Sequence, residues 1–220
     1  MHVRYSGIRG FSNIPNAVFI KHVYKKRFKR IFDVWTGFLA LVLLSPILAL
    51  ISTSIKITSR GPIFYKQLRV GKNGKTFELY KFRSMVPDAD EKKSNLSDMN
   101  EACGPAFKIK EDPRITNVGR VLRKYSLDEL PQLVNVIKGE MSLVGPRPPL
   151  PSEARRYTKF QKRRLCVTPG LTCYWQVSNR EMEFGQWVAL DVKYIKNMSF
   201  SEDMKLIFET IWFMAKGKNC

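Results

Sequence analysis

Residues 34–55 read VWTGFLALVLLSPILALISTSI, and this run of 22 residues without a charge decides the fold. As an α-helix it would measure about 33 Å, whereas the hydrocarbon layer of a bilayer is about 30 Å thick. A cleavable signal peptide is excluded, because the preceding segment is too long and no small-residue cleavage site follows. The run therefore predicts a helix that enters the membrane.

Basic residues flank this run on both sides. Five occur from Lys25 to Arg30, and six occur from Lys56 to Lys75. Lysine and arginine accumulate on the cytoplasmic side of membrane segments, so both ends of the helix are expected in the cytoplasm. A helix that crosses the bilayer cannot satisfy this expectation, whereas one that enters and returns can.

The dipeptide Ser45-Pro46 stands at the middle of the run. Proline removes a helical hydrogen bond and clashes with the carbonyl four residues earlier, here that of Val42, so the helix is expected to bend. Inside lipid the freed carbonyl needs a donor, which Ser45 or a neighbouring hydroxyl could supply. We therefore favour a re-entrant helix with a break at Ser45-Pro46 over the alternative, an ordinary transmembrane helix with a proline kink.

Composition narrows the functional classes. The chain has 220 residues, of which 44% are hydrophobic and 26% charged, enough to bury a core. Its net charge is +19, and residues 1–77 hold 14 basic residues against one acid, which predicts an anionic surface or polyanionic ligand near this third. The two histidines, His2 and His22, precede the hydrophobic run, so histidine catalysis and histidine-ligated zinc are nearly excluded.

The remaining chain predicts an α+β fold, rich in helices and with a small sheet. Residues 63–70 and 76–82 alternate in polarity around a Gly-Lys-Asn-Gly turn, which indicates a β-hairpin. Residues 87–100 are polar and indicate an exposed loop or a short helix. We expect three parts: a basic extension (1–24), the membrane helix (25–58) and a cytosolic domain (59–220). Helical periodicity occurs over residues 118–124, 128–138, 152–164, 184–195 and 201–215.

Two of these helices are expected to be amphipathic and to lie at the membrane interface. Residues 152–164 carry six cations together with Tyr157 and Phe160, and the alternative is a solvated basic face. Residues 201–215 place six apolar side chains along one face, from Met204 to Met214, and the alternative is packing against the protein core.

Without histidine, catalysis must depend on carboxylates and cations, and the candidate is Asp128-Glu129 in the sequence SLDELPQL. One interpretation is structural: Ser126 and Glu129 have the spacing of a capping box, although Pro131 fits a helix that starts at Asp128 better. The other is catalytic, because the basic residues just upstream would keep the carboxylates ionised and attract phosphate. An ionised aspartate can attack phosphorus while its neighbour holds Mg²⁺.

A second candidate lies in Gly145-Pro146-Arg147-Pro148-Pro149. The flanking prolines fix the backbone, so the guanidinium of Arg147 is held in advance in an orientation that suits bidentate phosphate binding. The alternative is an ordinary arginine in a rigid surface loop.

Seven motifs occur in order along the chain: KRIFD at 29–33, SP at 45–46, YKFRSM at 80–85, SLDELPQL at 126–133, MSLVGPRP at 141–148, TPGLT at 168–172 and LDVKYI at 190–195. In order and spacing they resemble those of the bacterial sugar transferases, the monotopic polyprenyl-phosphate phosphoglycosyl transferases. The resemblance covers about residues 25–216. Residues 172–176 read TCYWQ where members read TGWAQ, so the sugar specificity of those members is not carried over. Residues 1–24 leave no room for the extra N-terminal helices of large members, so a minimal catalytic form is expected.

The resemblance implies a re-entrant anchor on the cytoplasmic face of the bacterial inner membrane and a two-step reaction. Asp128 would attack the β-phosphate of a UDP-sugar and expel UMP, and the phosphosugar would then pass to undecaprenyl phosphate. This is the first membrane step of exopolysaccharide, capsule, O-antigen or glycoprotein glycan synthesis. Glu129 would bind Mg²⁺. Lys81, Arg123, Arg147 and Asp191 match family positions that line the site, and Tyr194 is a weaker addition.

The expected partners are a UDP-sugar, undecaprenyl phosphate and anionic inner-membrane lipids, with no nucleic acid. A homodimer is one of the oligomeric states left open. Two alternatives compete with the two-step reaction. One is a membrane-tethered basic protein that binds anionic lipid or nucleic acid without catalysis, and the other is a one-step enzyme with Asp128 as general base.

Overall fold

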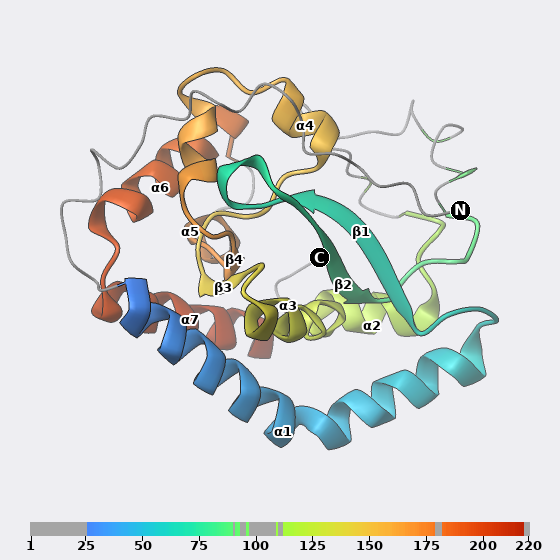
Figure 1. Cartoon of the computed structure of the whole chain (residues 1–220). Helices are drawn as coiled ribbons and strands as arrows, with labels where there is room; N and C mark the ends of the chain where they lie inside the picture. Colours follow the sequence, from blue (N-terminus) through green and yellow to red (C-terminus); the bar gives the residue numbers. More distant parts are fainter. Residues whose placement is uncertain are drawn as a thin grey trace.

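The computed structural model describes residues 26–89, 91–92, 96, 109, 112–178 and 182–217. The expected basic extension over residues 1–24 and most of the polar segment after residue 89 lie outside these described residues. Within them the chain forms helices and two small sheets of two strands each, in agreement with the predicted helix-rich α+β class (Figure 1).

The larger sheet is the predicted hairpin. Strands β1 (Phe64–Val70) and β2 (Thr76–Phe82) pair antiparallel around a 3₁₀ turn, η1 (Lys72–Gly74). Within the turn Asn73 has φ 56°, a left-handed conformation that asparagine tolerates better than most residues. The hairpin carries part of the pocket described below.

The second sheet was not predicted. Its strands, β3 (Ser142–Val144) and β4 (Gly170–Thr172), are three residues each and pair in parallel. A Cβ built on Gly170 would lie 2.0 Å from the backbone nitrogen of Gly145. Glycine is therefore required where the chain leaving β3 crosses the start of β4, which holds the loop containing Arg147 against β4.

The helices confirm three of the five predicted ones. The confirmed helices are α2 (Asn117–Lys124), α6 (Phe184–Asn197) and α7 (Phe200–Ala215). The predicted helix over 128–138 is instead a 3₁₀ turn, η3 (Leu127–Glu129), followed by α3 (Gln132–Lys138). Pro131 separates the two, because as the N-cap of α3 it need not donate a helical hydrogen bond. A short helix, α5 (Tyr174–Val177), precedes α6.

The prediction of one helix over residues 152–164 is wrong. The chain forms α4 (Pro151–Arg155) and then a separate 3₁₀ helix, η4 (Gln161–Cys166). Between them the Thr158 backbone N–H donates to Gln161 Oε1 at 2.8 Å, and the Gln161 N–H donates to Thr158 Oγ1 at 3.3 Å. This reciprocal pair has the arrangement of a capping box and lies between the two helical segments.

Helix α1 (Lys26–Thr58) is the longest element and contains Pro46. It bends near its middle, and both arms run from the bend toward the rest of the molecule (Figure 1). Ser45 Oγ donates to the carbonyl oxygen of Val42 at 2.8 Å, the carbonyl that proline deprives of its usual donor. The predicted bend and the predicted serine donor are both present.

Both arms of α1 pack on the same body. Leu41 and Leu44 of the first arm contact the main core around Leu133 and Val136. Ile55 of the second arm is buried in a smaller cluster with Phe82 and Leu122. The two ends of this helix therefore lie on one side of its bend.

Polar contacts fix the two ends of α1. At the start, Lys29 forms a buried ion pair with Asp203 of α7, and Arg30 Nη2 donates to the carbonyl of Ile137 at 2.6 Å, near the end of α3. At the other end, Arg83 donates to the carbonyl oxygens of Ser59 and Arg60 at 2.9 and 2.7 Å. These arginines satisfy carbonyls that helix ends leave without partners.

The face of α1 that points away from the body is apolar. Trp35, Leu43 and Leu50 are 70%, 68% and 69% exposed. Among the described residues α1 is the one helix long and apolar enough to cross a membrane, and its most apolar stretch is only 11% buried. A core helix of a soluble protein would be mostly covered.

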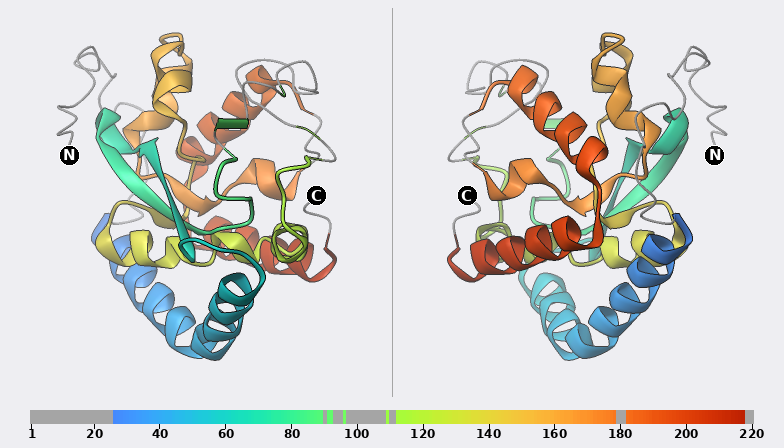
Figure 2. Two further views of the ribbon diagram at one scale, coloured as in Figure 1. Left: turned by 90° about the vertical axis from the view of Figure 1, so that its right-hand side faces the viewer. Right: turned by 90° about the vertical axis from the view of Figure 1, so that its left-hand side faces the viewer.

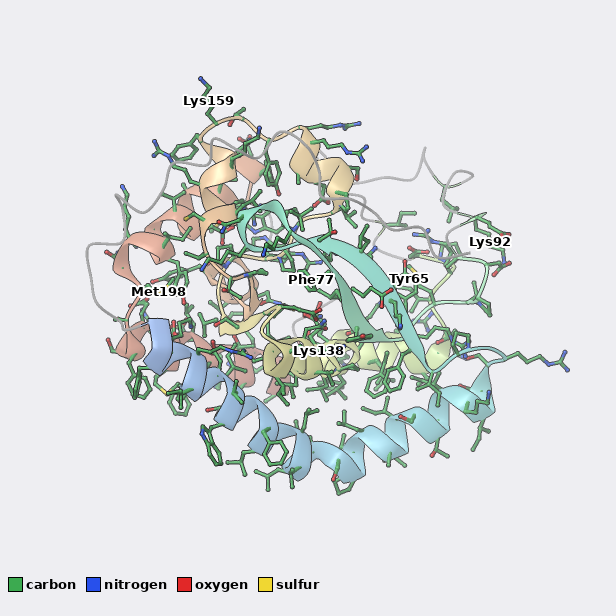
Figure 3. The ribbon with its side chains drawn as sticks, viewed as in Figure 1. Tyr65, Phe77, Lys92, Lys138, Lys159 and Met198 are labelled. Atoms are coloured by element: carbon green, nitrogen blue, oxygen red, sulfur yellow. The ribbon has the colours of Figure 1, made fainter. Side chains whose placement is uncertain are left out.

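Helix α4 and η4 lie at the end of the molecule opposite α1, and the two views of Figure 2 agree on this placement. The side chain of Lys159, between them, points away from the body at that end (Figure 3). The basic segment 152–164 is thus remote from the apolar face of α1.

Candidate active site

Asp128 and Glu129 lie on η3, immediately after Ser126. Ser126 has φ 51°, a left-handed conformation, and its side chain caps no helix. The capping-box interpretation of this motif is therefore wrong. The strained turn instead presents two adjacent carboxylates from a short rigid segment between α2 and α3.

Glu129 is surrounded by donors. Its Oε1 accepts a hydrogen bond from Lys81 Nζ at 2.7 Å and lies 3.8 Å from Arg147 Nη1, while Oε2 accepts from Gln176 Nε2 at 3.3 Å. Burial by itself disfavours the charged form, but the charges of Lys81 and Arg147 outweigh it and lower the pKa of Glu129 to about 2. Glu129 is ionised throughout the physiological range.

The pKa of Asp128 is shifted in the opposite direction. Its side chain is buried, at 7% exposure, and burial raises its pKa above the ordinary aspartate value. The charge of Glu129 acts in the same direction, whereas Lys81 and Arg123 oppose it. Arg123, at the end of α2, is held by a 2.9 Å bond from its Nε to Ser84 Oγ. Asp128 is a poorly hydrated carboxylate close to fixed cations.

A pocket opens beside Glu129. Three of its side chains are cationic and one is acidic, so it has excess positive charge and suits a multiply charged anion. Its lining residues are Arg69, Leu79, Lys81, Glu129, Gln132, Arg147, Pro148, Gly170, Leu171 and Gln176.

The register of the hairpin explains how two of the cations reach this pocket. Arg69 pairs with Phe77, Gln67 with Leu79 and Tyr65 with Lys81 across the strands. Directly paired residues share a face, and every second residue of a strand returns to it. Arg69, Leu79 and Lys81 therefore project from one face of the hairpin into the pocket.

The third cation, Arg147, comes from the loop after β3. Its guanidinium lies over the ring of Trp175, 5.6 Å from the centroid. The backbone of this loop is tied to the hairpin, because the Val70 N–H donates to the carbonyl of Pro149 at 2.9 Å. Trp175 belongs to the stretch TCYWQ over residues 172–176.

Four of the predicted site residues are not among those that line the pocket: Arg123, Asp128, Asp191 and Tyr194. Asp191 forms a buried ion pair with Arg164 at 2.6 Å, and Arg164 Nη2 donates to the carbonyl oxygen of Arg147 at 3.3 Å. The hydroxyl of Tyr194 is buried 2.7 Å from Asp203 Oδ1 and 3.1 Å from the carbonyl of Val144. Asp191 therefore acts through Arg164, which contacts the backbone of Arg147, and Tyr194 belongs to the core.

Three polar pocket residues were not predicted as site residues: Arg69, Gln132 and Gln176. The alternation of β1 could have indicated Arg69, because an arginine on the inner face of a strand needs a partner. Gln132 is part of SLDELPQL, and Gln176 ends the divergent stretch TCYWQ.

The donor set is compatible with a magnesium ion. Mg²⁺ is commonly bound through one or two carboxylates together with substrate phosphates, and Asp128 and Glu129 are two such carboxylates. Oε2 of Glu129 has only the long bond from Gln176, so it is the oxygen best placed to bind a metal. The described residues contain no cluster of three or more histidine, cysteine, aspartate or glutamate side chains, so phosphate oxygens would have to complete the coordination.

Comparison with known proteins assigns the chain to a group. Residues 24–217 match the family described as bacterial sugar transferase. Galactosyl transferase CpsE of Streptococcus agalactiae serotype III is 44% identical over 219 residues, which cover 97% of this chain and 48% of CpsE. Exopolysaccharide production protein ExoY of Sinorhizobium fredii is 43% identical over 188 residues, 83% of each chain.

A third relative is named for a lipid-linked reaction. Undecaprenyl-phosphate galactose phosphotransferase of Salmonella typhimurium is 44% identical over 189 residues, 83% of this chain and 39% of the relative. The chain thus spans about half or less of two of these relatives and most of ExoY.

Proposed function

Because this chain belongs to the bacterial sugar transferase family, we propose that it transfers a sugar 1-phosphate from a UDP-sugar to undecaprenyl phosphate. The products would be undecaprenyl-diphosphate-sugar and UMP, in the first membrane step of a polysaccharide pathway. One observation carries the proposal: the buried Asp128 directly precedes Glu129, which lines a pocket in which three cations outnumber one acid.

The first half-reaction begins with Asp128. A carboxylate oxygen attacks the β-phosphorus of the donor, and the bond from that phosphorus to the oxygen shared with UMP breaks. UMP leaves with the bonding electrons, and the sugar phosphate remains on Asp128 as an acyl phosphate. Lys81 and Arg147 are placed to stabilise the negative charge that develops on the phosphate oxygens.

The second half-reaction restores the carboxylate. An oxygen of undecaprenyl phosphate attacks the same phosphorus, and the bond to Asp128 breaks. Arg123, whose charge already acts on Asp128, would favour the carboxylate as leaving group. Glu129, together with the phosphates, would hold a Mg²⁺ ion, whose charge would offset the repulsion between anions.

We further propose that α1 enters the cytoplasmic leaflet of the inner membrane and returns. Its exposed apolar face and its bend support entry, and the packing of both arms on one body supports return. Exposed Phe208, Ile211 and Trp212 on the neighbouring α7 would lie at the same interface. Segment 152–164 would face the cytosol, because it lies at the other end of the molecule (Figure 2).

A donor panel tests the proposed reaction. Purified protein with Mg²⁺ and single UDP-sugars should release UMP, and undecaprenyl phosphate should raise the release from one equivalent to many turnovers. Without lipid, a burst of one UMP per enzyme indicates the covalent intermediate. If no UDP-sugar yields UMP with or without lipid while the protein binds polyanions in a salt-dependent manner, the non-catalytic alternative replaces the proposal.

A one-step transfer remains the second candidate, because a raised pKa is also what a general base needs. It would form no phosphosugar on Asp128 and would give no UMP in the absence of lipid.

A further inference from the structure

Arg69 lies in the pocket but belongs to none of the motifs that indicated the site. Its side chain is 8% exposed and lines the pocket together with Lys81 and Arg147. A buried guanidinium is costly unless its charge is compensated. Among the described residues no carboxylate forms an ion pair with Arg69, and the pocket's acid, Glu129, is already shared by Lys81 and Arg147.

The guanidinium of Arg69 is nevertheless held in one orientation. Gln67 Oε1 accepts from its Nε at 3.1 Å and from its Nη2 at 2.5 Å, and the carbonyl oxygen of Pro148 accepts from Nη1 at 2.9 Å. Gln67 stands two residues earlier on the same face of β1, so the strand itself places this support. One N–H on each terminal nitrogen of Arg69 has no acceptor within the described part of the chain.

Two observations thus coincide at Arg69: a buried positive charge without a direct ion pair among the described residues, and donors held in place at the pocket. Burial, and after it the nearby charge of Arg147, lower the pKa of Arg69 to about 10, although Glu153 and Glu129 act in the opposite direction. Part of the cost of the charged form is thus the closeness of two guanidinium groups. An anion bound between them would remove that cost. A diphosphate carries enough charge and enough oxygens to contact both arginines and Lys81 at once.

We propose that Arg69 binds the diphosphate of the donor as a second guanidinium beside Arg147, with Gln67 as the residue that positions it. This inference rests on the proposed function and adds a binding residue to it. Through its bond to Pro148, Arg69 also joins β1 to the loop containing Arg147, so the two arginines are held at a fixed spacing before the donor binds.

Isothermal titration of the full chain with UDP tests the proposal. Arg69→Met should weaken UDP binding by about tenfold or more, and Arg69→Lys, which keeps the charge but loses the planar group, should fall between it and wild type. Lys66→Met is the matched control: Lys66 lies on the same strand, its side chain is 57% exposed, and it pairs with Glu78 away from the pocket. Its UDP affinity should equal that of wild type.

Gln67→Met separates phosphate binding from loop support. It leaves Arg69 and its bond to Pro148 in place but removes the acceptor that orients the guanidinium, so UDP affinity should fall several-fold with an unchanged melting temperature. UDP affinities of Arg69→Met and Gln67→Met within twofold of wild type would overturn the inference. A wild-type protein that neither binds UDP nor releases UMP from any UDP-sugar would instead refute the proposed function.

Discussion

Asp128 and Glu129 are neighbours in sequence, yet their surroundings shift their pKa values in opposite directions. Burial and the charge of Glu129 raise the pKa of Asp128, whereas Lys81 and Arg147 hold that of Glu129 at about 2. Pairs of carboxylates that are separated in this way usually have different roles. Glu129 suits a role as a permanent negative charge, and Asp128 suits attack on phosphorus.

Asp128→Asn should abolish turnover, with a loss of about 10⁴-fold, and leave the fold intact. Asparagine has nearly the same size but cannot attack phosphorus, and it removes a buried charge. Wild-type enzyme given donor without lipid should gain one phosphosugar on tryptic peptide 125–138, as measured by mass spectrometry. The variant should gain none, and an adduct on another peptide of the wild type would exclude Asp128 as the nucleophile.

Lys81→Met should move the acid limb of the pH–rate profile to higher pH. The attack requires ionised Asp128, so kcat/KM rises with pH through its pKa, which burial already places above the ordinary value. The charge of Lys81 lowers that pKa, and its removal must therefore raise it. Lys66→Met, on the opposite face of the hairpin, should leave the limb in place. An unmoved limb in Lys81→Met would show that another group controls it.

At the scale of the element, α1 satisfies its own polar groups. Four hydroxyls in its second arm donate to the carbonyl four residues earlier, at 2.6–2.9 Å. They belong to Ser52, Thr53, Ser54 and Thr58. Together with the Ser45–Val42 bond they pair hydroxyls that would otherwise need a partner if α1 lies in lipid as proposed.

Pro46→Ala should straighten α1, because it restores the backbone donor to Val42 and removes the steric clash. A straight helix cannot keep both arms on the body, so Ile55 and Phe82 would separate. In a chain whose native cysteines are serine, single cysteines at Lys25 and Lys66 should react only from the cytoplasm in the Pro46 protein. In Pro46→Ala one of the two sites should become accessible from the periplasm.

Ser45→Ala is the matched control for this test. It keeps the bend but leaves the Val42 carbonyl without its serine donor, so both cysteines should still react only from the cytoplasm. If one of the two cysteines in the chain that retains Pro46 reacts only from the periplasm, the re-entrant arrangement is wrong.

Local pattern predicted the elements whose signals are local. The alternating hairpin and the bend at Pro46 followed from period and residue type alone. The prediction of one helix over residues 152–164 failed because the many basic residues gave no indication of the Thr158–Gln161 bonds between α4 and η4. Strands β3 and β4 are too short to show a period, and they exist because residues far apart in sequence come together.

The candidate site was likewise predicted only in part. Lys81, Glu129 and Arg147 converge as expected, because each lies in a motif of its own. Asp191 acts through Arg164, a contact that only the folded chain reveals. Tyr194 lies in the core. A motif position does not indicate whether a side chain faces a pocket or the core.

At the scale of the molecule, the Lys29–Asp203 pair joins the first helix to the last. Lys29→Met should lower stability by about 3–5 kcal/mol, because it leaves a buried aspartate without its cation. The double variant Lys29→Met, Asp203→Asn should recover much of this loss, since asparagine can still accept the bond from Tyr194. Urea unfolding in detergent measures both. Equal losses in the single and double variants would show that the charge of Asp203 is not what Lys29 compensates.

The same pair has a consequence for the order of events during synthesis. Lys29 and Asp203 are separated by 174 residues, which a bacterial ribosome needs roughly 9–35 s to add. The apolar helix therefore emerges long before its docking partner exists. In the proposed re-entrant arrangement lipid would receive it during that interval, so insertion would precede folding, and the rest of the protein would assemble on an anchor already in the bilayer.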